Sequence, residues 1–396
     1  MKPLLSVFID GLKPESVEHM PFLHSFKTLR RVKGEYGYSI ACHGSMYSGV
    51  HTDIHKLWFV WQYSPKSSPF RRLKYLYKIP LMSTLPGKLF LHKTAKLFEP
   101  EPNTSFFGLP RFVHVPMRLL QYLDVSEKRN YDESGYLTEV PSLFDIFRDN
   151  DIPFEVVGMD KSEKEESKIL ARHTNFRKLP FIYWFMGDVD HFSHEFGQDS
   201  DEARRRLRAL DKLLEKKYNE LVEAIGEVDF LLWSDHGHID VHKKIDLYEI
   251  FENQGNNLYK YLHVIDGTYA RFWFENPADE KEIRKVLKTL EQDGEILEIE
   301  DQKRYRVYPG DRRFGDLVFS LHPGAIFNKT IWGWSRKMKS MHGYNPNVPE
   351  SDGVILSNMD IVDDRQLELI DMTPSIMERL SLTPLPHMEG KSFWAH

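Results

Sequence analysis

The sequence predicts an α/β fold, with a mostly parallel central sheet sandwiched by helices. Three apolar runs carry this prediction, and they are Leu4–Ile9, Phe181–Met186 and Phe230–Trp233. A nearly unbroken apolar run that stops at a turn signal is typical of a strand buried on both faces. Each run is followed closely by an aspartate, so these strands would carry acidic groups at their carboxyl ends.

The aspartates in question are Asp10, Asp190 and Asp235. In an open parallel sheet, ligands bind beyond the carboxyl ends of the strands, at one shared edge. We therefore expect the three carboxylates to lie close together. Like charges at short range repel unless a cation lies between them, so the pattern predicts a divalent metal site.

Composition limits the class of protein. The 396 residues are enough for two average domains or one large α/β domain with insertions, and 41% of them are hydrophobic, which allows a substantial core. The net charge of -6 gives no support to a nucleic-acid polymer as the main ligand. Cys42, the single cysteine, excludes an internal disulfide, and we find no secretion signal and no membrane-spanning run. We expect a cytoplasmic protein.

Residues 1–57 are expected to form the first part of the α/β core. After the first strand, Pro14 suits the first turn of a short helix. Met20–Leu23 is expected to break the chain, after which a helix restarts and runs to about Leu29, and residues 34–38 then return toward the sheet. Ser39 opens a further helix that ends near Gly49.

Residues 58–135 are expected to be an insertion or lid, because prolines interrupt them and they show no clear periodicity. Their basic and aromatic stretch, Arg71–Lys78, has two interpretations. It is either a solvated helix face or a contact for an anionic or lipidic substrate.

The core is expected to continue in 136–261 and 336–396, separated by a small α+β subdomain at 262–335. The expected core elements are a helix capped by Ser142, strand Phe154–Gly158, helix 201–225, strand Gly353–Leu356 and helix Thr373–Leu380. The expected subdomain elements are strands Tyr269–Phe274 and Gly315–Ser320 and helix Ala278–Gln292.

Histidines accompany the aspartates that follow the strands. Asp190 and His194 are four residues apart and would share one face of a helical turn, although this spacing also suits a capped helix start. Asp235 and His236 can converge only where the backbone turns, which Gly237 permits. His342, also followed by glycine, is weaker evidence by itself.

Together these residues supply three carboxylates and three imidazoles, which is enough for two mixed oxygen and nitrogen sites. Such ligands suit two divalent ions, with zinc first and manganese or iron also compatible, and they suit calcium less well. Two ions about 4 Å apart can stabilise both the attacking and the leaving oxygen of a displacement at phosphorus.

Five motifs, in this order along the chain, resemble those of the alkaline phosphatase superfamily, and the type I phosphodiesterase/nucleotide pyrophosphatase branch in particular. They are Asp10-Gly11-Leu12-Lys13-Pro14, Ser39-Ile40-Ala41-Cys42-His43, Asp190-x-x-x-His194, Ser234-Asp235-His236-Gly237 and Met341-His342-Gly343-Tyr344. The resemblance covers the core and does not extend to 58–135 or 262–335.

The resemblance implies that Ser39 is the nucleophile and also touches a metal. It further implies that Asp10, Asp235 and His236 hold one ion beside Ser39, and that Asp190, His194 and His342 hold the second. Metal coordination favours a serine alkoxide, which agrees with this assignment. The alternative for Ser39 is a plain helix N-cap.

One departure concerns the residues after the nucleophile. The diesterase branch often has proline and asparagine where Ala41 and Cys42 stand, so the phosphate contact of that asparagine is missing. Cys42 is expected to be a small buried residue rather than a sulfatase-type nucleophile. His238 and His242 are expected to be surface histidines, with hydrogen bonding to a metal ligand as the alternative.

The expected reaction is hydrolysis of a small-molecule phosphate ester, a phosphodiester or pyrophosphate, through a covalent intermediate on Ser39. The alternatives within the superfamily are a phosphomonoesterase, a phosphonate hydrolase or a phosphomutase. Outside enzymes, the alternative is a metal-bound interaction module without turnover. The sequence does not indicate the leaving group or the oligomeric state.

Overall fold

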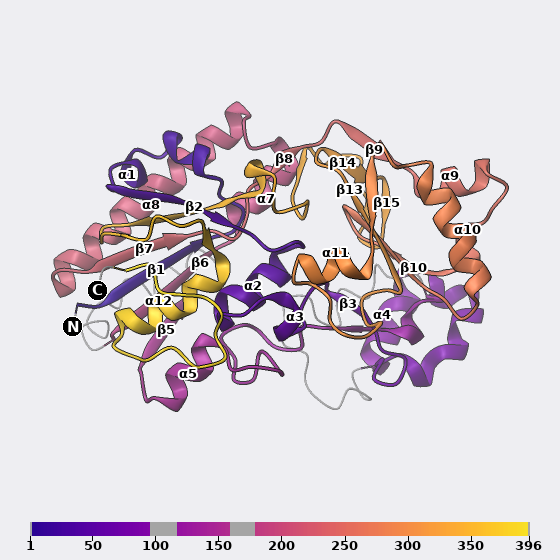
Figure 1. Cartoon of the computed structure of the whole chain (residues 1–396), viewed down its shortest axis with the longest axis horizontal. Helices are drawn as coiled ribbons and strands as arrows, with labels where there is room; N and C mark the ends of the chain where they lie inside the picture. Colours follow the sequence, from indigo (N-terminus) through magenta and orange to yellow (C-terminus); the bar gives the residue numbers. More distant parts are fainter. Residues whose placement is uncertain (1, 96–116, 159–178, 395–396) are drawn as a thin grey trace. The chain divides into compact units, whose positions relative to one another are not determined.

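The computed structural model describes residues 2–95, 117–158 and 179–394 (Figure 1). The chain forms two compact units, the first made of residues 1–51, 132–240 and 338–396 and the second of 52–131 and 241–337. Apart from 132–135, both the expected insertion at 58–135 and the expected subdomain at 262–335 fall in the second unit.

The first unit is built on a seven-stranded sheet with strand order β19-β2-β18-β7-β1-β6-β5. The strands are β1 Leu4–Ile9, β2 Thr28–Lys33, β5 Phe154–Val157, β6 Phe181–Met186, β7 Asp229–Trp233, β18 Gly353–Ser357 and β19 Leu367–Glu368. The central strands β7, β1, β6 and β5 are parallel, and β18 runs antiparallel to both of its neighbours. The predicted α/β fold with a mostly parallel sheet is confirmed.

The register of the central strands explains why their ends meet. Leu4 of β1 is aligned with Phe181 of β6 and with Asp229 of β7. At the other end, Ile9 is aligned with Met186. The residues that follow β1, β6 and β7 therefore leave the sheet at one edge, side by side.

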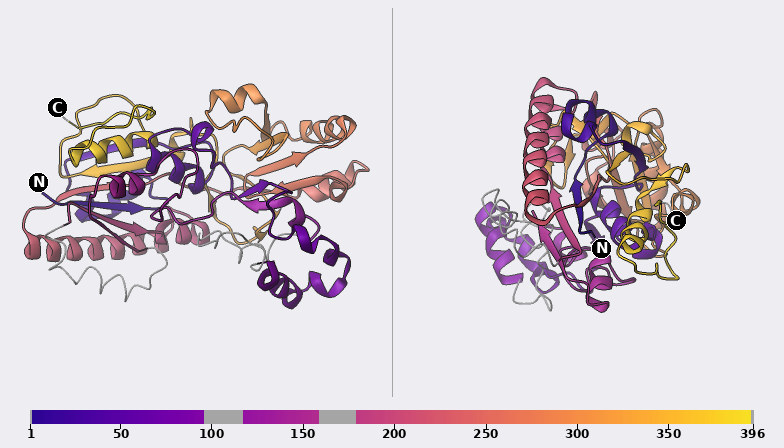
Figure 2. Two further views of the ribbon diagram at one scale, coloured as in Figure 1. Left: turned by 90° about the horizontal axis from the view of Figure 1, so that it is seen from below. Right: turned by 90° about the vertical axis from the view of Figure 1, so that its left-hand side faces the viewer.

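Helices cover both faces of this sheet, as the views in Figures 1 and 2 show, with α8 along one face and α12 across the other. The helices of this unit are α1 Pro21–His24, α2 Ser39–Ser48, α5 Leu143–Asp149, α7 Asp188–Phe196, α8 Asp201–Ile225 and α12 Met372–Arg379. Leucines of α8, such as Leu207 and Leu214, are buried in one hydrophobic cluster with Val7 and Leu232 of the sheet. Truncating a buried leucine of this kind to alanine costs about 2–5 kcal/mol of stability.

The other face is lined by aromatic side chains. Tyr47 of α2 and Phe144 of α5 pack their rings on Tyr183 of β6. The hydroxyl of Thr373 in α12 donates to the carbonyl of Met46 in α2, at 2.7 Å. These contacts hold α2, which begins at Ser39, against the sheet.

The expected break at Met20–Leu23 and the helix expected after it, running to about Leu29, are both wrong. Only Pro21–His24 is helical, and the chain then enters β2 at Thr28. The reason is non-local: five consecutive residues of β2 pair with β18, more than 300 residues later in the chain. Strand pairing of this kind overrides a short local preference for helix. The return to the sheet therefore occurs at β2 rather than at residues 34–38.

The second unit contains a four-stranded antiparallel sheet with the order β10-β11-β13-β12. The strands of the second unit, including those outside this sheet, are β3 Trp61–Tyr63, β4 Leu123–Val125, β9 Lys243–Ile245, β10 Leu262–Ile265, β11 Tyr269–Trp273, β12 Gly294–Leu297, β13 Leu317–Leu321, β14 Ala325–Phe327, β15 Lys329–Thr330 and β16 Gly333–Trp334. Its helices are α3 Thr52–His55, α4 Leu85–Ala95, α9 Leu247–Asn253, α10 Pro277–Lys288 and α11 Ile299–Arg304.

Residues 241–261, which were expected to belong to the core, pack within the second unit. β9 pairs with β14, and Leu247 and Phe251 of α9 are buried in the same hydrophobic cluster as Phe272 and Phe319. In the described part of the chain, no helix is both long enough and apolar enough to cross a membrane.

Candidate metal centre

All seven predicted site residues lie in the first unit and meet beyond the carboxyl ends of β1, β6 and β7. Asp10 follows β1, Asp190 and His194 lie one turn apart on α7, and Asp235 and His236 follow β7. His342 follows a short strand, β17 Ser340–Met341, which pairs with β8 Ile239–Asp240. The ligand atoms form three overlapping groups, each within 4.8 Å: Asp190, His194, His238 and His342; Asp10, Asp190 and His236; and Asp10, His43 and Asp235.

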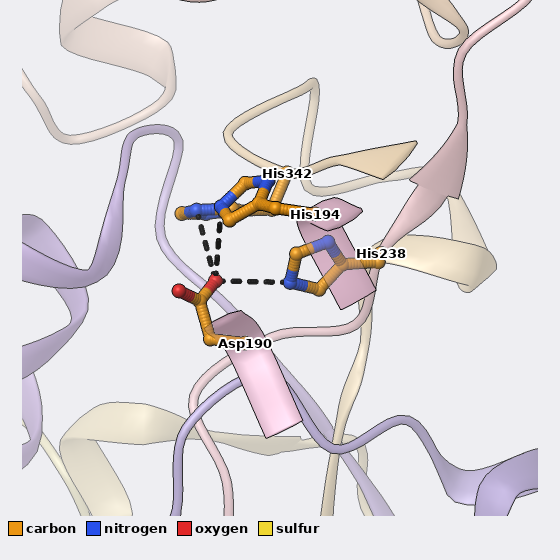
Figure 3. A group of neighbouring side chains, drawn as sticks. All are labelled: Asp190, His194, His238 and His342. Carbon is orange, nitrogen blue, oxygen red and sulfur yellow. Dashed lines mark hydrogen bonds and ion pairs between the residues drawn. The ribbon is translucent and has the colours of Figure 1, made fainter. Parts of the chain in front are cut away.

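Three imidazoles converge on one oxygen of Asp190 (Figure 3). The Nε2 atoms of His238, His194 and His342 lie 3.0, 3.2 and 3.4 Å from Asp190 Oδ1. We refer to these four residues as the Asp190 cluster. Burial raises the pKa of Asp190, but the neighbouring imidazoles, His194 foremost, outweigh it and hold that pKa well below its usual range.

The second group surrounds Ser39. The Ser39 Oγ atom lies 3.0 Å from Nε2 of His236, and the same nitrogen lies 3.2 Å from Asp235 Oδ2 and 3.6 Å from Asp10 Oδ1. Asp235 Oδ1 accepts from the backbone N–H groups of Gly11 and His236. These contacts orient the Asp235 carboxylate while its other oxygen faces the histidine.

The far nitrogens of two imidazoles show which atoms are available to a cation. Nδ1 of His236 lies 3.1 Å from the carbonyl oxygen of Gly237, and Nδ1 of His194 lies 3.0 Å from that of Ser340. A carbonyl oxygen only accepts, so Nδ1 carries the proton in both rings, and in the neutral ring Nε2 presents a lone pair. Metal-binding histidines are typically oriented in this way.

The carboxylates of the site repel one another electrostatically. Burial raises the pKa of Asp10 well above its usual value, and the charges of Asp235 and Asp190 raise it further. Asp10 Oδ1 and Asp235 Oδ2 are buried, and among the described residues no hydrogen-bond partner reaches either atom. Buried carboxylate oxygens without donors, facing imidazole lone pairs, fit bound divalent cations.

Ser39 is the first residue of α2, and it is not the N-cap. The N-cap is Tyr38, which makes no capping hydrogen bond through its side chain. The N-cap alternative for Ser39 is therefore excluded, and its hydroxyl instead points to His236. The N–H groups of Ala41 and Cys42 already donate to the carbonyl of Tyr38, so at the start of α2 an anion would meet the N–H groups of Ser39 and Ile40.

The expectation that His238 lies on the surface is wrong. Only 3% of His238 is exposed, and it contacts Asp190 within the cluster. The antiparallel pairing of β8 with β17 brings His238 beside Ser340, which a sequence pattern could not show. The sequence did contain one indication that His238 joins the site. His236 and His238 are two residues apart, and alternate side chains of an extended segment point to the same side. His242, in contrast, is exposed as expected.

His43 is a second residue whose position the sequence pattern did not predict. It lies one turn after Ser39 on α2, and its ring nitrogen falls within 4.8 Å of ligand atoms of Asp10 and Asp235. Burial, together with the charge of His236, lowers the pKa of His43 to about 3. A histidine four residues after the proposed nucleophile, on the same helix face, was the signal in the sequence.

Comparisons with known proteins identify the family and the fold of the chain. The family model "Type I phosphodiesterase / nucleotide pyrophosphatase" matches residues 118–345. The structure of human ectonucleotide pyrophosphatase/phosphodiesterase 5 is similar with a TM-score of 0.71 at 14% identity, covering 100% of this chain and 98% of that one. The murine protein of the same name gives a TM-score of 0.70 at 13% identity, covering 98% and 97%.

A further murine structure, an inactive variant in complex with AMP, gives a TM-score of 0.67 at 14% identity, covering 98% of this chain and 97% of that one. No curated protein matches this sequence. At such low identities, the structural likeness shows the fold.

Proposed function

This chain belongs to the type I phosphodiesterase/nucleotide pyrophosphatase family, and from that premise we propose that it hydrolyses small-molecule phosphodiesters or pyrophosphates through Ser39 and two divalent ions. Its hydrolase class and its place in the alkaline phosphatase superfamily follow from the family. The observation that carries the proposal is the position of the Ser39 hydroxyl beside His236, Asp235 and Asp10.

The donor sets suit two neighbouring ions. Asp10, Ser39, Asp235 and His236 would hold one, and Asp190, His194 and His342 the other. Zinc fits these oxygen and nitrogen ligands, and manganese or iron is compatible with them. When bound, such ions polarise phosphoryl oxygens and favour the alkoxide form of a serine.

The chain's own groups then account for two displacements. Ser39 Oγ attacks phosphorus, an Oγ–P bond forms, and the bond from phosphorus to the leaving oxygen breaks. The proton that Ser39 loses is balanced by the one that the leaving oxygen takes up, and the intermediate keeps the second substituent on phosphorus. In the second displacement water attacks this intermediate at phosphorus, the Oγ–P bond breaks, and a proton from the water restores the Ser39 hydroxyl. The N–H groups of Ser39 and Ile40, at the start of α2, would donate to phosphoryl oxygens during both steps.

Two details support a choice of substrate. The murine structure in complex with AMP supports a substrate that contains a nucleoside monophosphate. Cys42 stands where the family often has an asparagine that contacts phosphate, so the substrate preference within the superfamily is open and a phosphomonoesterase is the second candidate. We also propose a cytoplasmic location, since a single cysteine suits a reducing compartment.

A pair of chromogenic substrates tests the proposal. We expect the purified protein to hydrolyse bis-p-nitrophenyl phosphate faster than p-nitrophenyl phosphate, and the reverse preference would favour the monoesterase. Activity on neither substrate, nor on a panel of nucleotide diesters, would favour a mutase or a metal-bound module without turnover.

Ser39→Ala tests the nucleophile separately. We expect a loss of about 10³-fold or more in kcat, with metal content measured alongside. Ser48→Ala is the matched control, since Ser48 lies on the same helix and its hydroxyl donates to the carbonyl of Gly44. Undiminished hydrolysis by Ser39→Ala would show that Ser39 is not the nucleophile.

A further inference from the structure

We propose that His238 is a fourth protein ligand of the ion held by Asp190, His194 and His342. A tetrahedral ion at this site would then have no position left for substrate. The inference rests on the metal binding proposed above and is independent of whether the chain hydrolyses phosphate esters.

In the Asp190 cluster, His238 makes the same kind of contact with Asp190 as His194 and His342 do. Its Nε2 atom lies closer to Asp190 Oδ1, at 3.0 Å, than the corresponding atoms of His194 and His342. Figure 3 shows its ring directed at the same oxygen as the other two. A histidine that only oriented one of the metal ligands would not need to point at the same Asp190 oxygen as His194 and His342.

Hydrogen bonding determines which nitrogen of His238 carries the proton. The hydroxyl of Ser340 donates to the carbonyl of Ser193 at 2.6 Å, which uses its one proton. The contact of 3.1 Å between His238 Nδ1 and Ser340 Oγ therefore requires Nδ1 to be the donor. In the neutral ring, the Nε2 lone pair then faces a carboxylate oxygen, and two acceptors at this distance repel unless a cation lies between them.

The surroundings keep His238 in this position. Its side chain is fully buried, and its backbone leads directly into β8, which pairs with β17. Gly11 has φ +74°, and a Cβ atom there would lie 3.0 Å from His238 Nε2 and 3.1 Å from the Cα of Asp190. A glycine at this turn thus leaves the room that the ring of His238 occupies.

Four ligands change what the site can do. Catalytic zinc sites usually have three protein ligands and an open position, whereas four protein ligands are typical of structural zinc. With His238 bound, a substrate oxygen could enter only as a fifth ligand, which manganese or iron accepts more readily than zinc. The Asp190 cluster would therefore select between ions by coordination number.

A crystal structure of the zinc-loaded protein tests this directly. We expect an anomalous-scattering peak about 2.0–2.1 Å from His238 Nε2 that is also bound by Asp190, His194 and His342. An ion held by the other three with His238 beyond bonding distance would overturn the proposal, and so would the absence of an ion from the cluster.

Zinc affinity provides a second measurement that does not depend on turnover. In competition with a chromogenic chelator, His238→Ala and His238→Gln should weaken binding at one site by more than about 100-fold, since loss of an outer partner costs about 10–100-fold. The matched control is His263→Ala, a buried histidine in the second unit that contacts Tyr248 and Tyr261. A loss of about 100-fold or less in both His238 variants would assign His238 an outer role and refute the proposal.

A different observation concerns residues 70–95 of the second unit, which we name the basic apolar segment. Six of the eleven exposed large hydrophobic side chains of the described residues fall in it: Tyr75, Ile79, Leu81, Leu85, Leu89 and Phe90. The segment contains six lysines and arginines and no aspartate or glutamate. Exposed apolar and basic residues on short helices are typical of segments that lie on a membrane surface.

We infer that the basic apolar segment binds an anionic lipid surface. Leu81, Leu85 and Phe90 are 63%, 62% and 55% exposed, so they are available to enter the boundary between lipid headgroups and acyl chains. Each lysine or arginine near an anionic surface adds about 1 kcal/mol of attraction. The segment is closely packed within itself. A Cβ atom added at Gly87 of α4 would lie only 2.2 Å from the carbonyl oxygen of Leu81.

Vesicle sedimentation tests the lipid surface. We expect binding to phosphatidylcholine vesicles that contain phosphatidylglycerol, weaker binding in high salt, and little binding to phosphatidylcholine alone. The double variant Leu85→Glu with Leu89→Glu should reduce the bound fraction at least 10-fold. The matched control carries Tyr259→Glu and Val362→Glu, which change exposed apolar residues elsewhere.

Equal binding by both double variants, or no binding by the parent protein, would refute the inference. Tighter binding to an oligonucleotide than to anionic vesicles would also refute it, in favour of nucleic acid as the ligand of this segment.

Discussion

Asp10→Asn should stabilise the metal-free protein and reduce the stabilisation that metal provides. Oxygen atoms of Asp10 lie within 4.8 Å of ligand oxygens of both Asp190 and Asp235. At an effective dielectric constant of about 20, two unit charges at this distance repel by about 3.5 kcal/mol. The raised pKa of Asp10 shows that the fold disfavours its charge.

The net gain is smaller than this repulsion, because partial protonation of Asp10 already relieves part of it. We expect Asp10→Asn to stabilise the metal-free protein by about 1–3 kcal/mol, which corresponds to about 2–4 °C in Tm per kcal/mol for a unit of this size. Each ion present at 100 times its Kd should stabilise the parent protein by about 2.7 kcal/mol. The variant, which lacks one carboxylate of the Ser39 site, should lose most of the contribution of one ion.

Thermal melting of chelator-treated protein, with and without zinc, measures both effects. Asp360→Asn is the control, since Asp360 is exposed and outside the site. The reasoning would be refuted if Asp10→Asn lowered Tm equally in the two conditions, because Asp10 would then be a structural hydrogen-bonding group and not part of a repelling cluster.

Three further predictions follow from the structure. Chelation should abolish hydrolysis, and zinc, manganese or iron should restore it, as measured by p-nitrophenol release; activity that survives complete metal removal would contradict the two-ion proposal. Asp211→Ala should destabilise the protein by about 2–4 kcal/mol in denaturant unfolding, since the buried Asp211 carboxylate accepts from the backbone N–H groups of Phe22 and Leu23, which would be left without it. Burial raises the pKa of Asp352 to about 6, above its unfolded value, so the stability that its protonated form contributes is present at low pH and lost as pH rises through about 6. Asp352→Asn should therefore gain in Tm relative to the parent protein between pH 4 and pH 8, and a constant difference across that range would contradict the assignment.

The sequence was sufficient for the elements whose position depends on a strong local pattern. Continuous apolar runs predicted β1, β6 and β7, and parallel strands share one carboxyl edge, so the convergence of Asp10, Asp190 and Asp235 could be expected from the order of residues alone. The family motifs added Ser39 and His342, neither of which has a distinctive local pattern.

The tertiary structure decided what depends on pairing between distant segments. β2 is a strand because β18, from the other end of the chain, pairs with it, and local sequence favoured a helix in its place. His238 is buried because the pairing of β8 with β17 brings it beside Ser340, although nearby residues in the sequence made it look like a surface histidine. A local sequence pattern reflects the periodicity of one helix or strand. The burial of a side chain, and which nitrogen of a histidine carries the proton, depend on the residues that pack against it from other segments. For that reason the sequence could indicate the metal site, but only the folded chain reveals that His238 and His43 also lie in it.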